Sequence, residues 1–201
     1  MNQINTTEVK QVFASYNYLE RQTFPKFRFC PQCATTLELR KVDGRQRLKC
    51  PHCGFVYYLN PSPCVSLLLL EAGKVLLVKR GNGNYLPDRW CLPCGFIEYD
   101  EDFLTAAVRE AKEETGLSIH IESILSVASN FHTPVLHSLV VVLLARVTGG
   151  RLTPGDDVTA CQWVPLKGPY PELAFAADRH ILERYGKTGW KGVPVDRDYA
   201  G

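Results

Sequence analysis

The segment from Gly95 to Leu117 constrains the fold more than any other part of the chain. Between Asp102 and Thr115 the apolar residues recur at helical spacing, which predicts an amphipathic helix that ends at the following glycine. Glu110, Glu113 and Glu114 stand at positions i, i+3 and i+4, so this helix places three carboxylates on one side within one turn. The segment therefore predicts a helix that carries a concentrated negative charge.

Like charges at this spacing destabilise a helix unless something compensates them. Hard divalent cations are natural candidates, because magnesium prefers carboxylate oxygens and keeps coordination sites for water and phosphate. Arg109 is placed to pair with Glu101 or Glu113, which would orient the metal ligands. Many solvated helices carry similar runs of glutamate, however, so the carboxylates alone do not distinguish a metal site from a surface.

The spacing of the whole segment favours the metal site. It resembles the Nudix box, G-x5-E-x7-R-E-U-x-E-E-x-G-U with U a bulky aliphatic residue, at all seven fixed positions. At a frequency of about 7% per residue, such a match arises by chance on the order of 10⁻⁸ times per start position. Ala111 is smaller than the usual residue at the first U, and Cys94 replaces a small residue in a W-x-L-P-G-G-like lead-in that starts at Trp90. The resemblance covers residues 63–166.

This resemblance implies an α/β fold, an α-β-α sandwich with a mixed sheet. It implies Mg²⁺ or Mn²⁺ bound by Glu110, Glu113 and Glu114, with Glu101 acting through Arg109. It also implies an enzyme that cleaves the pyrophosphate bond of a nucleoside diphosphate derivative, a small-molecule nucleotide substrate, with a water nucleophile activated by the metal.

The general base remains open at this stage. One of the glutamates of the box would serve, as analogy with the family favours. The alternative is an acidic residue on a later loop, for which Asp156 and Asp157 are the nearby candidates.

A second pattern predicts a zinc site. Cys30-x2-Cys33 and Cys50-x2-Cys53 are separated by sixteen residues, the spacing of a four-thiolate zinc ribbon. His52 lies between two of these cysteines, but four thiolates already complete a tetrahedron, so it is left out. Since the module is too small for a core of its own, we expect Zn²⁺ to act as a folding staple.

Another cysteine pair imitates a redox motif. Cys91 and Cys94 form W-C-L-P-C, which is superficially similar to a thioredoxin active site. We interpret it as a coincidence, because the Nudix lead-in accounts for the neighbouring residues and no helix is expected to start at Cys94.

The chain is divided into three parts. Residues 1–28 form an N-terminal segment of unclear role with a weak helical pattern, residues 29–59 form the zinc ribbon, and residues 60–201 form the Nudix hydrolase domain. The linker lies at Asn60–Pro63, where two prolines resist regular structure. The helical pattern of the first part consists of Val9, Val12, Phe13 and Tyr16.

In the hydrolase domain, β-branched runs alternate with two helical segments, which favours an α/β class. Residues 64–70 and 74–80 predict a hairpin, and residues 81–90 a polar loop. The remaining predicted elements are strands at 119–128, 136–147 and 161–164 and a final helix at about 172–185.

Charge and hydropathy limit the partners. Seven basic residues and two acidic ones lie between Lys26 and Cys53, a balance of +5, so the remainder of this chain of net charge +2 carries −3. A basic ribbon could attract a polyanion, although solvated charge is commoner. No apolar run reaches the roughly 20 residues of a membrane helix, and residues 1–10 lack a secretory signal. We expect a cytoplasmic protein with no membrane partner. The sequence does not decide whether the protein forms a homodimer.

Substrate choice rests on resemblance alone. Ribbon-bearing Nudix proteins include NADH pyrophosphatases and a group with FAD and ADP-ribose pyrophosphatases. The first group usually has S-Q-P-W-P-F-P downstream of the box, which Ser126–Pro134 lacks, and this places NADH last. The stretches at Tyr58–Pro61 and Leu173–Phe175 resemble the second group, so we rank FAD, ADP-ribose and NADH in that order. The alternatives are a nucleic-acid-binding or regulatory Nudix-fold protein and a hydrolase of capped RNA ends. Aromatic residues that would stack on a substrate or belong to the core are Tyr85, Phe96, Tyr99 and Phe131.

Overall fold

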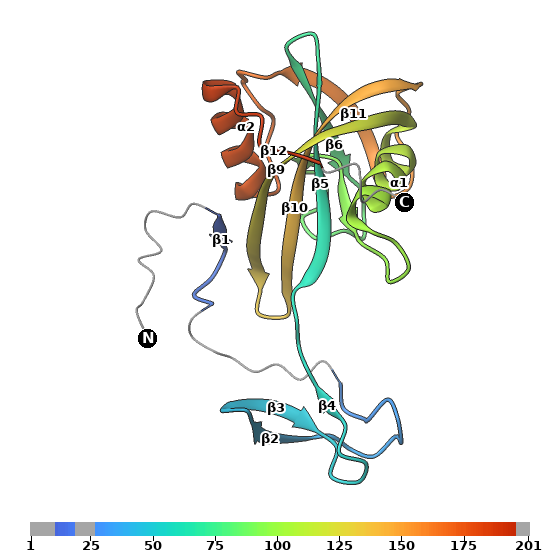
Figure 1. Cartoon of the computed structure of the whole chain (residues 1–201), viewed down its shortest axis with the longest axis vertical. Coiled ribbons are helices and arrows are strands. Elements are labelled where there is room, and N and C mark those ends of the chain that lie inside the picture. The colour runs from blue at the N-terminus through green and yellow to red at the C-terminus, as the bar shows by residue number, and fades with distance from the viewer. Residues whose placement is uncertain (1–10, 19–26, 196–201) are drawn as a thin grey trace. The chain divides into compact units, whose positions relative to one another are not determined.

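The computed structural model describes residues 11–18 and 27–195, which fall into two compact units (Figure 1). The first unit contains most of the chain after residue 62. The second contains the cysteine module and residues 131–138, the end of a long hairpin. Each unit is described separately.

The first unit contains two helices and most of the strands (Figure 1). The helices are α1 (Phe103–Thr115) and α2 (Ala176–Thr188). The strands of the described chain are β1 (Val12–Ala14), β2 (Glu38–Val42), β3 (Arg45–Lys49), β4 (Val56–Tyr57), β5 (Ser62–Glu71), β6 (Lys74–Arg80), β7 (Trp90–Cys91), β8 (Cys94–Phe96), β9 (Leu117–Thr133), β10 (Leu136–Gly150), β11 (Val158–Pro165) and β12 (Val193–Pro194).

A mixed sheet of nine strands forms the centre of this unit in the described part of the chain. Its main path runs β1-β9-β10-β5-β6-β11, and β12, β7 and β8 pair with β9, β6 and β5. Strand β5 is buried over most of its length, as expected for a strand with both faces covered.

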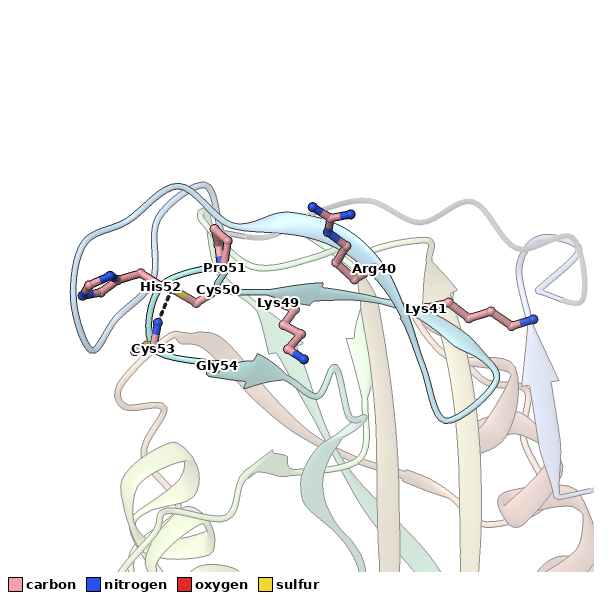
Figure 2. Close-up of a pocket in the computed structure, with 8 residues that line it drawn as sticks. All are labelled: Arg40, Lys41, Lys49, Cys50, Pro51, His52, Cys53 and Gly54. Carbon is pink, nitrogen blue, oxygen red and sulfur yellow. Dashed lines mark hydrogen bonds between the residues drawn. The ribbon is translucent and has the colours of Figure 1, made fainter.

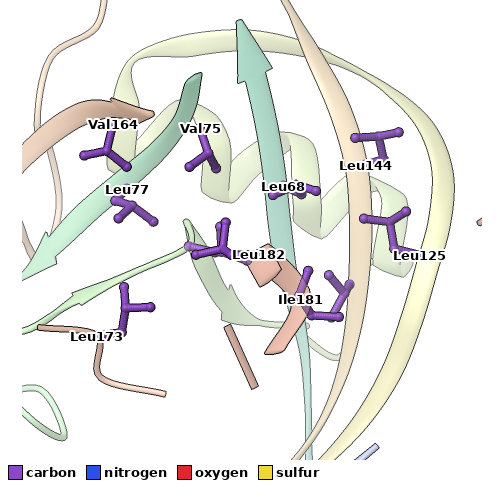
Figure 3. Close-up of a cluster of buried hydrophobic side chains, with 11 residues drawn as sticks. Leu68, Val75, Leu77, Leu125, Leu144, Val164, Leu173, Ile181 and Leu182 are labelled. Atoms are coloured by element: carbon purple, nitrogen blue, oxygen red, sulfur yellow. The ribbon is translucent and has the colours of Figure 1, made fainter. Parts of the chain in front are cut away.

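The alternation of side chains along the strands creates two cores. In β5, Val65, Leu67 and Leu69 face one cluster and Leu68 faces the other. The first cluster includes the alanines of α1, and the second includes Ile181 and other side chains of α2 (Figure 3). One helix therefore covers each face of the sheet (Figure 1), which confirms the predicted α-β-α sandwich.

The helix suggested near the N-terminus is wrong where the structure describes it. Val12–Ala14 is a strand that pairs with β9, and Val9 lies outside the described residues. The backbone of Gln11 accepts a hydrogen bond from Ser129 at 2.8 Å. The exposed edge of β9 offers backbone groups that outweigh a weak helical preference.

Helix α2 begins later than predicted. The backbone N–H of Trp90 donates to Glu172 O at 2.9 Å and that of Ala174 donates to Trp90 O at 2.7 Å, so residues 172–174 are extended beside β7. The short strands β7 and β8 were also absent from the sequence prediction, because they are stabilised by pairing with β6 and β5.

The second unit contains a three-stranded antiparallel sheet, β2-β3-β4. Its small core consists of Leu37 and Leu48 packed with the cysteines and two half-buried aromatic rings. Among the described residues, neither helix has the length and hydropathy that crossing a membrane would require.

Candidate active site and zinc ribbon

Helix α1 is fixed at both ends. The Asp102 carboxylate accepts hydrogen bonds from the backbone of Leu104 at 2.8 Å and Thr105 at 3.0 Å, which satisfies N–H groups that a helix start leaves unpaired. At the other end Gly116 adopts the left-handed conformation (φ 70°) and donates its N–H to Lys112 O. These caps hold the three glutamates of the last two turns in place.

Arg109 joins three carboxylates. Its Nε donates to Glu101 Oε2 at 3.0 Å, and its Nη1 donates to Glu110 Oε1 and to Glu113 Oε2, both at 2.8 Å. Its Nη2 donates to the carbonyl of Phe96 at 3.0 Å. Hydrogen bonding to Arg109 lowers the pKa of the Glu101 carboxyl. Arg109 thus contacts both partners proposed from the sequence and Glu110 as well.

Two of the glutamates are buried. Glu110 is 8% exposed and Glu114 is 3% exposed. Burial raises the pKa of Glu110 in spite of Arg109, and it raises the pKa of Glu114 well above the ordinary value. The backbone N–H of Cys94 donates to Glu114 Oε2 at 3.0 Å. Burial of ionisable groups costs free energy, so the positions of these two carboxylates lower the stability of the fold.

Gly95 leaves the space that Glu110 occupies. A Cβ atom on Gly95 would lie 1.9 Å from Glu110 Oε1. The first residue of the box is therefore a glycine because the carboxylate lies directly against its Cα. The sequence pattern contained this glycine, but only the folded chain shows its function.

A later loop closes over the end of α1. The backbone N–H of Gly155 donates to Glu114 O at 3.1 Å. The negative charges of the next two residues act on the buried glutamates: Asp156 raises the pKa of Glu110, and Asp157 raises that of Glu114, each as a lesser cause than burial. Both candidate bases from the sequence analysis are therefore near the carboxylates of α1.

The glutamates do not form a compact ligand set in this structure. Arg109 Nη1 lies between Glu110 and Glu113, while Glu114 is directed to Cys94 N. The carboxylates are nonetheless of the type that binds hard divalent cations.

The four ribbon cysteines are gathered tightly. Their Sγ atoms all lie within 4.8 Å of one another, and the sulfurs of Cys33 and Cys50 are 3.5 Å apart. Among the described residues this is the one group of three or more Cys, His, Asp or Glu side chains at metal-binding distance. The spacing fits four thiolates around one zinc ion.

In each cysteine loop a backbone amide points at the sulfur of the first cysteine. The N–H of Gln32 points at Cys30 Sγ at 3.4 Å, and the N–H of Cys53 points at Cys50 Sγ at the same distance. Gly54 follows with φ 78° and donates to Cys50 O at 3.2 Å. Amides directed at sulfur stabilise thiolates, as a zinc ligand set requires.

Cys91 and Cys94 lack the helix start of a thioredoxin-like redox pair, and the Cys94 thiol lacks a lowered pKa. Cys94 belongs to β8, and the next helix begins at Phe103, as the sequence analysis expected. A hydrogen bond to Cys91 and burial raise the pKa of the Cys94 thiol, which disfavours the reactive thiolate.

Of the four aromatic residues considered for substrate stacking, two are exposed. Phe96 is 53% exposed, and Tyr99 projects fully into solvent in the loop before Glu101. Phe131 instead stacks on Tyr18, with ring centroids 3.9 Å apart.

Sequence reasoning missed one buried acid. Asp178 in the first turn of α2 is 6% exposed and accepts a hydrogen bond from the N–H of Leu92 at 3.0 Å. Burial raises its pKa to about 7. A single aspartate in a helical pattern gives no signal of this, since its partner is far away in the sequence.

Comparison with known protein families identifies the class of protein to which this fold belongs. The features to be explained are the sandwich, the glutamates of α1 and the cysteine cluster. The chain matches the NUDIX domain family over residues 60–185 and the Nudix N-terminal zinc ribbon family over residues 28–59. It belongs to the Nudix family of hydrolases.

Individual relatives agree with this assignment. The chain is 37% identical over 135 residues to an ADP-ribose pyrophosphatase of Methanocaldococcus jannaschii, which covers 67% of this chain and 77% of that protein. It is 31% identical over 171 residues to an NAD-capped RNA hydrolase NudC of Chromobacterium violaceum, covering 82% of this chain but 62% of the relative. A crystal structure of a Nudix hydrolase from Nitrosomonas europaea superposes with a TM-score of 0.70, at 28% identity, over 84% of this chain and 96% of that one.

Proposed function

We propose that the protein hydrolyses the pyrophosphate bond of a nucleoside diphosphate linked to a second moiety, with ADP-ribose as the leading substrate. The observation that carries the proposal is the cluster at the end of α1, where one arginine joins Glu101, Glu110 and Glu113 beside the buried Glu114. The proposed metal ligands are Glu110, Glu113 and Glu114.

The donor set fits magnesium or manganese. The site contains carboxylate oxygens, and burial of Glu110 and Glu114 costs folding free energy. Arg109 supplies one positive charge, which cannot neutralise the three glutamates proposed as ligands. Bound divalent cations would neutralise the substrate's phosphates and activate a water molecule. Arg109 is a positioning residue because it contacts Glu110 and Glu113, and Glu101 is one because it holds Arg109.

The proton from the attacking water needs an acceptor. A glutamate of the box remains our first candidate, and Asp156 and Asp157 remain the alternative because their charges reach Glu110 and Glu114. Asp156→Asn and Asp157→Asn separate these two cases. Loss of the acidic limb of the kcat–pH profile, the rise of kcat with pH, in one aspartate variant would transfer the role to that residue.

The sequence patterns rank FAD first, but we place ADP-ribose ahead of FAD and NADH because of a relative. The relative with the highest identity given above is an ADP-ribose pyrophosphatase, and this chain spans 77% of it. The box itself contacts metal and pyrophosphate and carries no information on the second moiety.

Cleavage of NAD-capped RNA is the second candidate. It is supported by relatives named NAD-capped RNA hydrolase, whose match extends over 82% of this chain in the case of Chromobacterium violaceum. This chain spans about half to three fifths of the length of those proteins. The S-Q-P-W-P-F-P element is absent from Ser126–Pro134, which instead forms part of β9 and its turn.

One assay tests both candidates. We would compare kcat/KM for ADP-ribose, FAD, NADH, an NAD-capped oligonucleotide and the common nucleoside triphosphates with Mg²⁺ or Mn²⁺ present, following AMP or capped-end release. ADP-ribose should be preferred by at least tenfold over the triphosphates. A triphosphate preferred by the same factor would overturn the substrate class, and no turnover of any pyrophosphate would overturn the proposed function.

We also propose the division of the chain into a segment 1–28, a ribbon 29–59 that folds around one zinc ion, and a catalytic domain 60–201. Limited proteolysis with and without a zinc chelator tests this division. When the chelator is present, cleavage should concentrate in residues 29–59.

A further inference from the structure

The zinc ribbon concentrates positive charge on one face of its hairpin. The register pairs Arg40 with Arg47 and places Glu38 opposite Lys49 and Val42 opposite Arg45. Directly opposed residues of an antiparallel pair point to the same face. Four basic side chains and one acidic side chain therefore share this face.

Two of these residues also line a hollow. Its volume is about 750 Å³, and its lining includes Arg40, Lys41, Lys49 and His52 together with the second cysteine loop (Figure 2). All four of these side chains are exposed. Apart from the cysteine thiols, the hollow contains no acidic side chain. Its walls thus suit an anion of phosphate size or larger.

The arrangement weakens the ribbon. Like charges directly opposite each other destabilise a strand pair, and Arg40 and Arg47 stand in that position. Arg40 is relieved in part by Glu38 at 2.5 Å, in an exposed ion pair. Arg47 lies over the ring of Tyr58, and its Nε is buried without a hydrogen-bond partner among the described residues. Because the core of this module is small, its folding free energy is small, and the repulsion between these charges lowers it further.

Exposed aromatic rings accompany the charges. Tyr58 is 50% exposed and Phe29 is 53% exposed. Each has a guanidinium over it: that of Arg47 is 4.6 Å from the Tyr58 centroid, and that of Arg28 is 5.4 Å from the Phe29 centroid. Aromatic rings interleaved with basic side chains are typical of surfaces on which unpaired bases stack while phosphates contact the cations.

We propose that the hollow lined by Arg40, Lys41 and Lys49, together with the exposed ring of Tyr58, binds single-stranded nucleic acid. A duplex hides its base faces and would leave the rings unused, whereas a single strand offers both phosphates and bases. The inference is independent of the proposed function, because binding to the ribbon needs no pyrophosphate and no catalysis.

The test uses the full-length zinc-loaded protein and a fluorescent 12-nucleotide RNA with a 5′-hydroxyl, so that the catalytic site has no pyrophosphate to act on. Fluorescence anisotropy gives Kd across a salt series. The triple variant Arg40→Gln, Lys41→Gln, Lys49→Gln should weaken binding at least tenfold at low salt. It should also reduce the slope of log K against log salt by about 2, since each phosphate contact of a single strand contributes about 0.7.

A matched control removes the same charge elsewhere. Lys74, Lys167 and Lys187 are exposed on the catalytic domain, and their replacement by glutamine should leave Kd within twofold. Tyr58→Leu should weaken RNA binding at least fivefold while zinc content stays unchanged, which separates stacking from folding. Both triple variants should retain wild-type hydrolysis of the best small nucleotide substrate.

Three outcomes would overturn the inference: no measurable binding by the wild type, equal losses in the two triple variants, or tighter binding of duplex than of single-stranded RNA. If RNA binding fails while nucleotide hydrolysis persists, the proposed function stands. If hydrolysis fails while binding depends on the ribbon residues, the inference stands alone. DNA of the same sequence should bind alike, because stacking and phosphate contacts do not require a 2′-hydroxyl.

Discussion

Replacing Gly95 with alanine would test the role of Glu110 without removing its carboxylate. The added Cβ would lie 1.9 Å from Glu110 Oε1 and 2.0 Å from its Cδ, whereas real Cβ contacts essentially never fall below 3.0 Å. The backbone of Gly95 is paired with Val65 in the sheet and cannot retreat. Glu110 must therefore move by at least 1.1 Å, the difference between 3.0 and 1.9 Å.

That displacement is large for a catalytic group. A misplacement of about 1 Å can reduce a rate about 100-fold, which corresponds to about 2.7 kcal/mol of activation free energy. The shift would also lengthen the 2.8 Å contact between Glu110 and Arg109 Nη1. We expect kcat/KM to fall by about 10- to 100-fold. The melting temperature should change by only a few degrees, because the displaced atoms are the end of a side chain.

The assay is steady-state hydrolysis of the best nucleotide substrate, with thermal unfolding followed by circular dichroism. Gly149→Ala is the control, since a Cβ there meets nothing within 4 Å. Adding Glu110→Asp to Gly95→Ala should restore part of the lost activity, because the shorter side chain withdraws its carboxylate from the new methyl. Wild-type kcat/KM in Gly95→Ala would refute the reasoning, as would a double variant no better than the single one.

Three further predictions follow from the site and the ribbon. Glu113→Gln and Glu114→Gln should each lower kcat at least tenfold without loss of fold, and wild-type turnover in either would contradict the proposed ligand set. Elemental analysis of freshly purified protein should find about one zinc per chain, and Cys50→Ser should lose it; protein without zinc would exclude the site. Burial raises the pKa of Asp178 to about 7 from 3.8, so its contribution is fully favourable below the unfolded pKa and is lost as pH rises through about 7. Asp178→Asn keeps an acceptor for Leu92 N, so in urea unfolding it should gain stability over the wild type between pH 5 and pH 8, by at most about 4 kcal/mol. An equal difference at both pH values would be inconsistent with this.

The parts of the structure that depend on local pattern could be predicted from the sequence. Helix α1 was expected at 102–115 and is observed at Phe103–Thr115, because apolar spacing and a terminal glycine act within one segment. The gathering of the four cysteines also followed from spacing alone, since each pair fits one short loop.

The rest depends on pairing between distant segments. Val12–Ala14 is a strand because the edge of β9 is available, and the start of α2 is delayed because residues 172–174 pair with Trp90. The closeness of Gly95 to Glu110 and of Asp178 to Leu92 N is likewise a product of tertiary packing. The spacing of apolar residues reflects only local structure, so a single sequence cannot reveal such contacts between distant segments.

The strongest departure from rules of stable folding occurs at the proposed catalytic site. Glu114 is 3% exposed, and burial raises its pKa well above the ordinary value, so the folded state resists its ionisation. A carboxyl with a raised pKa destabilises the fold increasingly as pH rises. Glutamine at this position keeps an oxygen for the N–H of Cys94 and removes the charge. In zinc-loaded protein, Glu114→Gln should therefore melt higher than the wild type at pH 8 in buffer without magnesium or manganese, and added magnesium should narrow the gap by stabilising only the wild type. A variant that melts lower in the magnesium-free buffer would show that the Glu114 carboxylate is retained for stability and not as a metal ligand.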